Sequence, residues 1–250
     1  MKTLKVRNKN AIIELLRGGA NFEKISIVKD LKQDDLTKEI VSTAKSRGIQ
    51  IKIDPIGKMP KRRNGQTKEV LIGFLILENI WSLKNLLDEL RKKNQDPFFL
   101  LVNRVDFESN IGIIARTAFA AGVNGLVFQG EENRFLNEET LHFSIGAIAR
   151  IPLVKMNIFE ALKELKENGI KTFSLQMGGA AYFKEDVTGP VAFVLGAEGK
   201  GVSEKVSSRC DKKLTIPMRK DIDSLNVGIS AAIILYEKIR QEGSDFLTRK

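Results

Sequence analysis

The sequence predicts an α/β protein in which a small basic α/β unit precedes a larger unit built on an open, mostly parallel sheet. In the second part of the chain, short apolar runs alternate with segments of helical pattern, as in strands joined by crossover helices. The charge is also divided unevenly. Residues 1–96 hold 21 Lys and Arg against 12 Asp and Glu, a net charge of +9, whereas residues 97–250 hold 20 against 19, a net charge of +1. The two parts are therefore expected to have different functions, and the first is expected to bind a polyanion.

The composition excludes several classes of protein. The 250 residues are 42% hydrophobic and 29% charged, which is ordinary globular composition. One cysteine, Cys210, cannot form an internal disulfide, and with one histidine, His142, it cannot build a zinc site from His and Cys. His142 is expected to be structural. No apolar run is long enough for a bilayer, and the N-terminus has no apolar signal core. We therefore expect a cytoplasmic protein with no metal and no membrane partner.

Residues 1–77 are predicted to form the basic unit, because helical and strand patterns alternate along them. Residues 10–17 carry apolar side chains at helical spacing and stop at two glycines, as a helix does. A second helix is predicted over 34–45, and strands over 24–28, 49–53 and 70–77. Between the last two strands lies a basic segment with Gly and Pro and no apolar period, which reads either as a solvated loop or as a phosphate contact. We favour the phosphate contact because the segment lies in the basic part, with these candidate RNA-binding residues: Lys58, Lys61, Arg62, Arg63 and Lys68.

Residues 78–96 are predicted to link the two units, as an amphipathic helix over 82–93 followed by a polar stretch that ends at a proline. Residues 97–250 form the larger unit, which begins with the continuous apolar run 98–102, typical of a buried parallel strand. Further strands are predicted over 125–128, 151–155, 172–176, 191–195 and 214–218, and helices over 111–121, 138–147, 158–168, 203–210 and 224–241. Ligands of such sheets bind beyond the carboxyl ends of the strands.

Three polar or glycine-rich segments follow predicted strands. In the first, Ser109 or Asn110 can cap a helix on which Arg116 follows Asn110 by about 1.7 turns. The second, residues 196–201, has the glycine spacing GxxGxG, which differs from the GxGxxG of dinucleotide-binding folds. In the third, Pro217 ends a strand and Ser224 can cap a helix of small residues. Taken singly, each segment is also compatible with a capped helix, a tight turn or close helix packing.

Together and in this order, the three segments resemble motifs 1, 2 and 3 of the SpoU (TrmH-like) branch of the SPOUT RNA methyltransferases. The matching stretches are Asn110 to Arg116, Gly196 to Gly201, and Ile216 to Asn226, and Ser144-Ile145-Gly146-Ala147 matches a further family segment. The resemblance covers about residues 98–241. It implies an enzyme that uses S-adenosyl-L-methionine to methylate a ribose 2′-hydroxyl in RNA. It also implies a deep trefoil knot at the carboxyl end of the sheet and a homodimer formed through the C-terminal domain.

The resemblance also implies roles for individual residues. The implied catalytic residues are Asn110, Arg116, Glu198, Ser224 and Asn226, and the implied cofactor-binding residues are Gly196, Ala197, Gly199, Gly201, Ile216, Pro217, Met218 and Leu225. The family places Arg116 on the 2′-hydroxyl. Because a guanidinium is rarely neutral, we expect it to orient the ribose phosphate or to stabilise the developing alkoxide. A role as base stays open if the adjacent phosphate assists.

Residues 1–77 are similar in pattern to the substrate-binding domain, ribosomal-protein-like (L30e-like) in fold, that precedes the catalytic domain in ribosomal RNA members. This similarity favours large-subunit ribosomal RNA as the substrate. Many such members carry His-Gln-Gly near the end of this domain, where this chain reads Asn64-Gly65-Gln66-Thr67. Two alternatives remain: a tRNA 2′-O-methyltransferase, and a non-catalytic RNA-binding or ribosome-assembly protein that keeps the fold.

Overall fold

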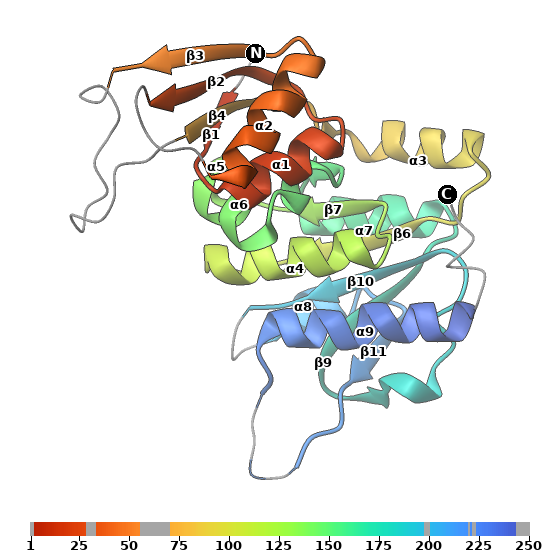
Figure 1. Cartoon of the computed structure of the whole chain (residues 1–250). Coiled ribbons are helices and arrows are strands. Elements are labelled where there is room, and N and C mark those ends of the chain that lie inside the picture. Colours follow the sequence, from red (N-terminus) through yellow and green to blue (C-terminus); the bar gives the residue numbers. More distant parts are fainter. Residues whose placement is uncertain are drawn as a thin grey trace.

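The computed structural model describes residues 3–28, 34–55, 71–197, 201–219, 221 and 224–243. It has two sheets, a small one formed by the N-terminal strands and a larger parallel one formed by the strands that follow in sequence (Figure 1). The predicted α/β class and mostly parallel sheet are confirmed. In the described ranges, no helix is both long and apolar enough to cross a bilayer.

The small sheet has the strand order β1-β4-β2-β3. Its strands are β1 (Thr3–Val6), β2 (Phe22–Val28), β3 (Gln50–Asp54) and β4 (Leu71–Ile76). Strands β2 and β3 are parallel, and β4 runs antiparallel to both β1 and β2. Helices α1 (Lys9–Arg17) and α2 (Asp35–Ser46) pack together beside this sheet. Each helix is capped by the preceding side chain, Asn8 or Asp34, which accepts from the free backbone N–H groups of the first turn.

The larger sheet has the order β11-β9-β10-β6-β7-β8-β5, and every adjacent pair is parallel. Its strands in chain order are β5 (Ile80–Trp81), β6 (Phe98–Val102), β7 (Gly125–Phe128), β8 (Leu153–Lys155), β9 (Lys171–Ala181), β10 (Val191–Leu195) and β11 (Lys212–Thr215). All residues of β6 and β10 are buried, which explains their uninterrupted apolar sequences.

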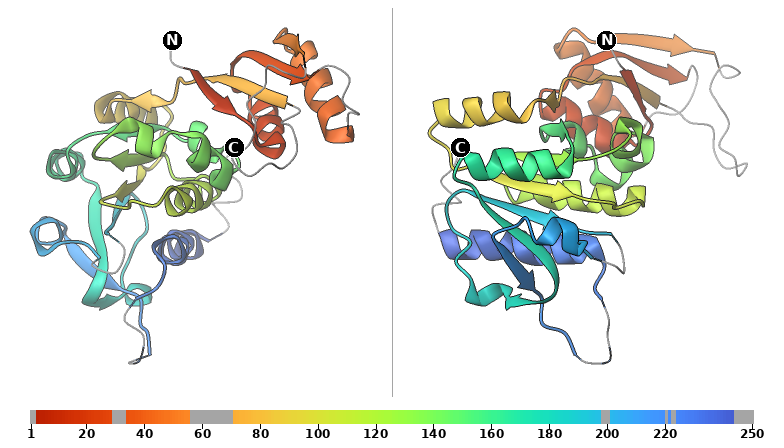
Figure 2. Two further views of the ribbon diagram at one scale, coloured as in Figure 1. Left: turned by 90° about the vertical axis from the view of Figure 1, so that its left-hand side faces the viewer. Right: turned by 180° about the vertical axis from the view of Figure 1, so that it is seen from behind.

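Helices cover both faces of the larger sheet, as Figure 2 (left) shows from the side toward which the strand ends point. They are α3 (Leu83–Lys92), α4 (Glu108–Ala120), α5 (Glu132–Phe135), α6 (Glu138–Ser144), α7 (Ile158–Glu167), α8 (Glu204–Ser207) and α9 (Val227–Glu242), with two 3₁₀ turns, η1 (Ala147–Ala149) and η2 (Tyr182–Lys184). Leucines and isoleucines of α4, α6 and α9 share one core cluster, and those of α3 and α7 share the other.

The segment 78–96 is more than the linker that we expected. Strand β5 pairs with β8 at the edge of the larger sheet, and α3 buries Leu83, Leu86, Leu87 and Leu90 against that sheet. An apolar stripe of this kind needs a surface to cover, and the neighbouring face of the parallel sheet provides it. Several boundaries also differ: α8 is shorter than predicted, β11 begins and ends earlier, and β9 is six residues longer.

The small unit is joined to the larger one by contacts of α6 and the turn after it with α1 and the residues just before α1. The amide of Asn8 donates to Nδ1 of His142 at 2.8 Å, and Arg7 forms an ion pair with Glu138. Gly146 lies so close to Leu15 that a Cβ there would be 2.8 Å from the leucine side chain. His142 therefore has the structural role expected of it, and one core cluster continues from the small sheet into the larger unit.

Candidate active site

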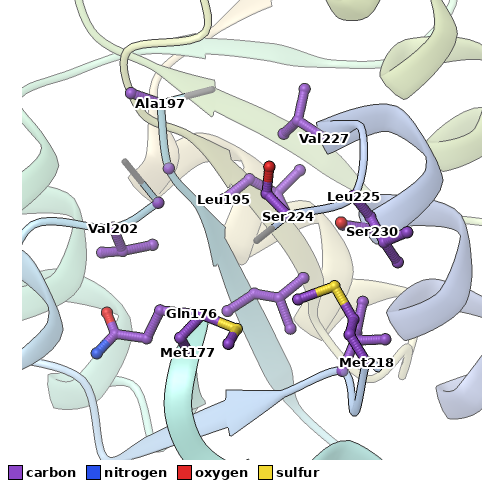
Figure 3. Close-up of a pocket in the computed structure, with 14 residues that line it drawn as sticks. Gln176, Met177, Leu195, Ala197, Val202, Met218, Ser224, Leu225, Val227 and Ser230 are labelled. Carbon is purple, nitrogen blue, oxygen red and sulfur yellow. The ribbon is translucent and has the colours of Figure 1, made fainter. Parts of the chain in front are cut away.

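A cavity of about 280 Å³ lies at the carboxyl ends of the central strands of the larger sheet, beside the start of α9. Figure 3 shows side chains from β9, from the end of β10 and from the segment before α9 converging on it. Its wall is formed by Leu175, Gln176, Met177, Leu195, Gly196, Ala197, Gly201, Val202, Ile216, Met218, Ser224, Leu225, Val227 and Ser230. Two of the three segments singled out in the sequence thus contribute directly to one cavity.

A bulge in β9 builds one wall of this cavity. Lys213 of β11 pairs with Ser174, but the next residue, Leu214, pairs with Ala180, so residues 175–179 have no partner across the ladder. The bulge is closed by Thr215, whose hydroxyl donates to the Gln176 carbonyl at 2.6 Å and accepts from the Gly179 N–H at 2.7 Å. Leu175, Gln176 and Met177, which the prediction missed, are therefore turned into the cavity. Two consecutive glycines after Met177, in a sequence otherwise typical of a strand, are the signal that could have revealed the bulge.

The glycine loop after β10 folds back on itself at the edge of the cavity. The Gly201 N–H donates to the Ala197 carbonyl at 2.8 Å, and Gly201 has a φ of +62°, which favours glycine. A Cβ on Gly196 would lie 1.9 Å from the carbonyl carbon of Gly201, so only glycine fits there. Glu198 and Gly199, predicted as catalytic and cofactor-binding, lie outside the described residues. So do the predicted RNA-binding residues Lys58, Lys61, Arg62, Arg63 and Lys68.

The third segment lines the cavity in part. Ile216, Met218, Ser224 and Leu225 form its far wall, but Pro217 is exposed and is not part of the lining. The prediction that the backbone around Pro217 contacts the cofactor stays a prediction. The chain is extended here, so successive side chains alternate in direction: Ile216 and Met218 face the cavity, and Pro217 between them faces away from it. Ser224 also does not cap the helix as we expected, because α9 begins three residues later and is capped by Asn226.

Asn226 joins the third segment to the first. Its side-chain oxygen accepts from the Gly228 N–H at 2.8 Å, while its amide donates to Oδ1 of Asn110 at 3.0 Å, across 116 residues of sequence. Asn110 is buried in the first turn of α4, which begins at Glu108, so neither Ser109 nor Asn110 is the helix cap. The predicted juxtaposition of Asn110 and Asn226 is thus present, although their capping roles differ from those expected.

Arg116 lies two turns further along α4 with an exposed side chain. Within the described part of the chain, no hydrogen bond or ion pair connects it with Asn110, Ser224 or Asn226. A single chain therefore brings Asn110 and Asn226 into contact, places Ser224 in the cavity wall, and leaves the Arg116 guanidinium free to meet another molecule.

The cavity is apolar with a few polar groups at defined places. Among the described lining residues no side chain is charged. The side-chain oxygen of Gln176 is buried without a hydrogen-bond partner, which is costly unless a ligand supplies a donor. Cys210 takes no part in this site, since burial raises the pKa of its thiol to about 12 and keeps it protonated.

An open parallel sheet whose strand ends enclose an apolar, glycine-walled cavity defines the binding site of a small organic molecule. The chain belongs to the SpoU rRNA Methylase family, whose model it matches over residues 97–236. It is 31% identical to YacO of Bacillus subtilis, a protein named for the TrmH family of tRNA/rRNA methyltransferases, over 94% of this chain and 95% of that protein.

Two solved structures extend this comparison. The SpoU methyltransferase AviRb from Streptomyces viridochromogenes, solved with the cofactor AdoMet, superposes with a TM-score of 0.76 at 20% identity over 96% of this chain and 90% of that chain. The A. aeolicus TrmH/SpoU tRNA modifying enzyme superposes with a TM-score of 0.56 at 28% identity, over 66% of this chain and 88% of its own. The protein is thus an RNA methyltransferase of the TrmH/SpoU family.

Proposed function

We propose that the protein transfers a methyl group from S-adenosyl-L-methionine to a ribose 2′-hydroxyl of large-subunit ribosomal RNA in the cytoplasm. The observation that carries the proposal is the convergence of three segments, far apart in sequence, on one place. The glycine loop and the segment 216–225 wall the cavity, and the Asn110–Asn226 hydrogen bond brings the first segment beside it.

The cavity fits the proposed cofactor in three respects. Its apolar side chains, such as Val202, Ile216 and Leu225, can enclose the flat adenine ring. The backbone of Gly196, Ala197 and Gly201 is accessible because no side chain covers it. The unpartnered oxygen of Gln176 can accept a hydrogen bond from an amino group, and the cofactor carries such groups.

When bound, S-adenosyl-L-methionine supplies an electrophilic methyl group that moves to the 2′-oxygen as the carbon–sulfur bond breaks and the hydroxyl proton leaves. The chain's own residues position the two reactants and stabilise the charge that develops on the oxygen. Asn110 and Asn226 hold each other, so they fix the start of α9 against α4 at the mouth of the site. We assign Arg116 to the ribose and its phosphate, with Ser224 and Glu198 completing the site.

Methyl transfer to RNA tests this proposal. The protein is incubated with S-adenosyl-L-methionine carrying a tritiated methyl group and with total RNA from a strain that lacks the gene. We expect label in large-subunit ribosomal RNA, recovered after alkaline hydrolysis as a resistant dinucleotide, because a methylated 2′-oxygen cannot attack the adjacent phosphate. Label in the tRNA fraction would favour the tRNA alternative. Cofactor binding without any methyl transfer would favour the non-catalytic alternative.

The preference for ribosomal RNA rests on the N-terminal unit. The A. aeolicus tRNA modifying enzyme matches 66% of this chain while using 88% of its own, so about a third of this chain has no counterpart there. Residues 1–77, which we propose as an L30e-like substrate-binding domain, are of that size and belong to the part with the net charge of +9. A separate basic domain favours a large, highly structured RNA over a tRNA.

Replacing Lys61, Arg62 and Arg63 by Gln is expected to weaken RNA binding and to reduce its dependence on salt. Each lost phosphate contact lowers the slope of log K against log salt by about 0.7 to 0.9, so three contacts lower it by about 2 to 3. The slope is measured by fluorescence anisotropy with labelled ribosomal RNA fragments at several salt concentrations. The matched control replaces Lys163, Lys166 and Lys171 by Gln in the larger unit, at exposed positions that line neither this cavity nor the second one beside it. A slope that is the same in the first variant, in the control and in the wild-type protein would return the segment to a solvated loop.

We further propose that the C-terminal part is knotted and that two copies pair through it. Helices α4 and α9 pack against each other, with Ile113 against Gly228, and both leave large apolar side chains exposed. Ile113 is 42% exposed on α4, and Ile229 and Tyr236, two turns apart on the same face of α9, are 53% and 49% exposed. A second copy would remove this surface from water.

Replacing Ile229 by Asp is expected to convert the proposed dimer into a monomer. A carboxylate placed in an apolar interface loses hydration without gaining a partner. The mass is measured by light scattering coupled to gel filtration. The control, Phe183→Asp, places the same charge at another exposed apolar residue, on η2, and should leave the mass unchanged. A wild-type protein that is monomeric at micromolar concentration would contradict the dimer.

A further inference from the structure

A second cavity, of about 470 Å³, lies next to the first and takes no part in the function proposed above. It opens where β6 and β7 end and where α7 and α8 begin, on the strand-end side seen in Figure 2 (left). The two cavities lie on either side of the end of β10. The Asn103 N–H donates to the Leu195 carbonyl at 3.0 Å, and Val202 lines the first cavity while Ser203 lines the second.

Asn103 gives this cavity a carboxamide that is available to a ligand. The residue is only 7% exposed and lines the cavity, yet its carboxamide has no hydrogen-bond partner in the described part of the chain. Its polar atoms are not among the buried unpartnered ones, so they face the space of the cavity and can exchange water for the donors and acceptors of a ligand. Gln129, at the end of β7, adds a second carboxamide whose oxygen accepts from the Ile158 N–H at 3.1 Å. That bond leaves the NH₂ group of Gln129 available.

The remaining lining combines apolar surface with positive charge. Phe159, which has the Arg209 guanidinium 4.8 Å from its ring centre, and Phe135, which is stacked on Phe128, contribute aromatic surface. Arg104 and Lys205 line the cavity with exposed side chains, and neither has a carboxylate within 4 Å among the described residues. A third cation, Arg134, is neutralised by Asp106 at 3.0 Å. Glu131 also lines the cavity, so the charge favours an anion without being uniformly positive.

We propose that this cavity holds one unpaired base of the RNA substrate, a neighbour of the nucleotide that is methylated. A base has flat apolar faces and an edge of donors and acceptors, which match the aromatic rings and the two carboxamides. Its phosphate matches Arg104 and Lys205 at the rim. A simple anion would need neither the rings nor the carboxamides. The proposal rests on the proposed function in naming RNA, and it adds a second contact that selects the sequence beside the target.

The test measures binding of fluorescein-labelled single-stranded hexaribonucleotides of A, C and U by anisotropy, with and without S-adenosylhomocysteine. Asn103→Ala is expected to weaken binding of the preferred hexamer about tenfold, the range for losing one good base contact. Asn103→Asp keeps the size but removes the donor, so it should change the order of preference among the three hexamers. Lys205→Gln, at an exposed position, should lower the salt slope by about one. The matched control is Asn133→Ala, an exposed asparagine on α5 outside the cavity.

Equal affinities for the Asn103→Ala and Asn133→Ala proteins would overturn the proposal. If Asn103→Ala fails to fold, the slope and preferences measured with Lys205→Gln decide, and an unchanged slope overturns it. A third outcome concerns the free nucleotides AMP, CMP and UMP. If their binding depends on Asn103 while hexamer binding does not, the ligand of the cavity is a free nucleotide and the proposal is overturned. None of these measurements needs methyl transfer. Failure of wild-type protein to bind S-adenosylhomocysteine would thus sink the proposed function while leaving this test intact.

Discussion

Replacing Arg116 by Ala is expected to reduce methyl transfer by about 10²- to 10³-fold or more while changing cofactor affinity by less than about twofold. The size of the loss is that of removing a group that stabilises negative charge as it develops in the transition state. The side chain is exposed on α4 and lies outside the cavity lining, so the substitution leaves no buried hole and no unpaired partner. Fold and cofactor site should therefore both survive.

The experiment combines single-turnover methyl transfer at saturating RNA with calorimetric binding of S-adenosylhomocysteine. Arg91→Ala removes another exposed arginine, which makes a surface ion pair with Asp88 on α3, and should leave both quantities unchanged. Arg116→Lys separates the possible roles, because a lysine keeps the positive charge but loses the planar fork. Partial activity in Arg116→Lys would support charge stabilisation. Full activity in Arg116→Ala would remove this residue from the chemistry.

The sequence was most informative where one physical requirement dominates a segment. Strands buried on both faces must be apolar throughout, so β6 and β10 were predicted with the boundaries that the structure has. Amphipathic helices with glycine stops, such as α1, were placed to within one residue. The short strand β1 was missed although polar and apolar residues alternate along it, because one alternation over four residues is too short to distinguish a strand from a loop.

The candidate site was predictable only in part, because much of it depends on contacts between distant segments. The Asn226 side chain could be matched to a motif, but not its hydrogen bond to Asn110, because that bond joins two segments 116 residues apart. Gln176 and Met177 line the cavity because the register between β9 and β11 slips by five residues. No periodicity within β9 can report a register that β11 imposes.

Replacing Gly196 by Ala is expected to destabilise the protein by about 3 kcal/mol and to weaken cofactor binding at least tenfold. The added Cβ would lie 1.9 Å from the Gly201 carbonyl carbon and 2.1 Å from the Val202 nitrogen. Both are backbone atoms, which cannot rotate away as a side-chain tip can. Relief requires the loop after β10 to move away from the strand, and overpacking of this kind typically costs about 1–3 kcal/mol. The same movement would carry Ala197 and Gly201 away from the cavity wall that they form.

The matched control separates lack of space from backbone conformation. Gly169 follows α7 with a φ of +72°, and a Cβ there would meet nothing within 4 Å. Gly169→Ala should therefore cost only the strain of a positive φ, about 1–2 kcal/mol, with cofactor affinity unchanged. Urea unfolding and calorimetry with S-adenosylhomocysteine measure both quantities for both variants. If Gly196→Ala loses stability without losing affinity, the loop closes the fold but does not bind the cofactor. If only Gly196→Ala loses cofactor affinity as well as stability, the close approach of the Gly196 and Gly201 backbones is needed for binding. Backbone strain would not explain that result, because Gly169→Ala carries the larger conformational strain.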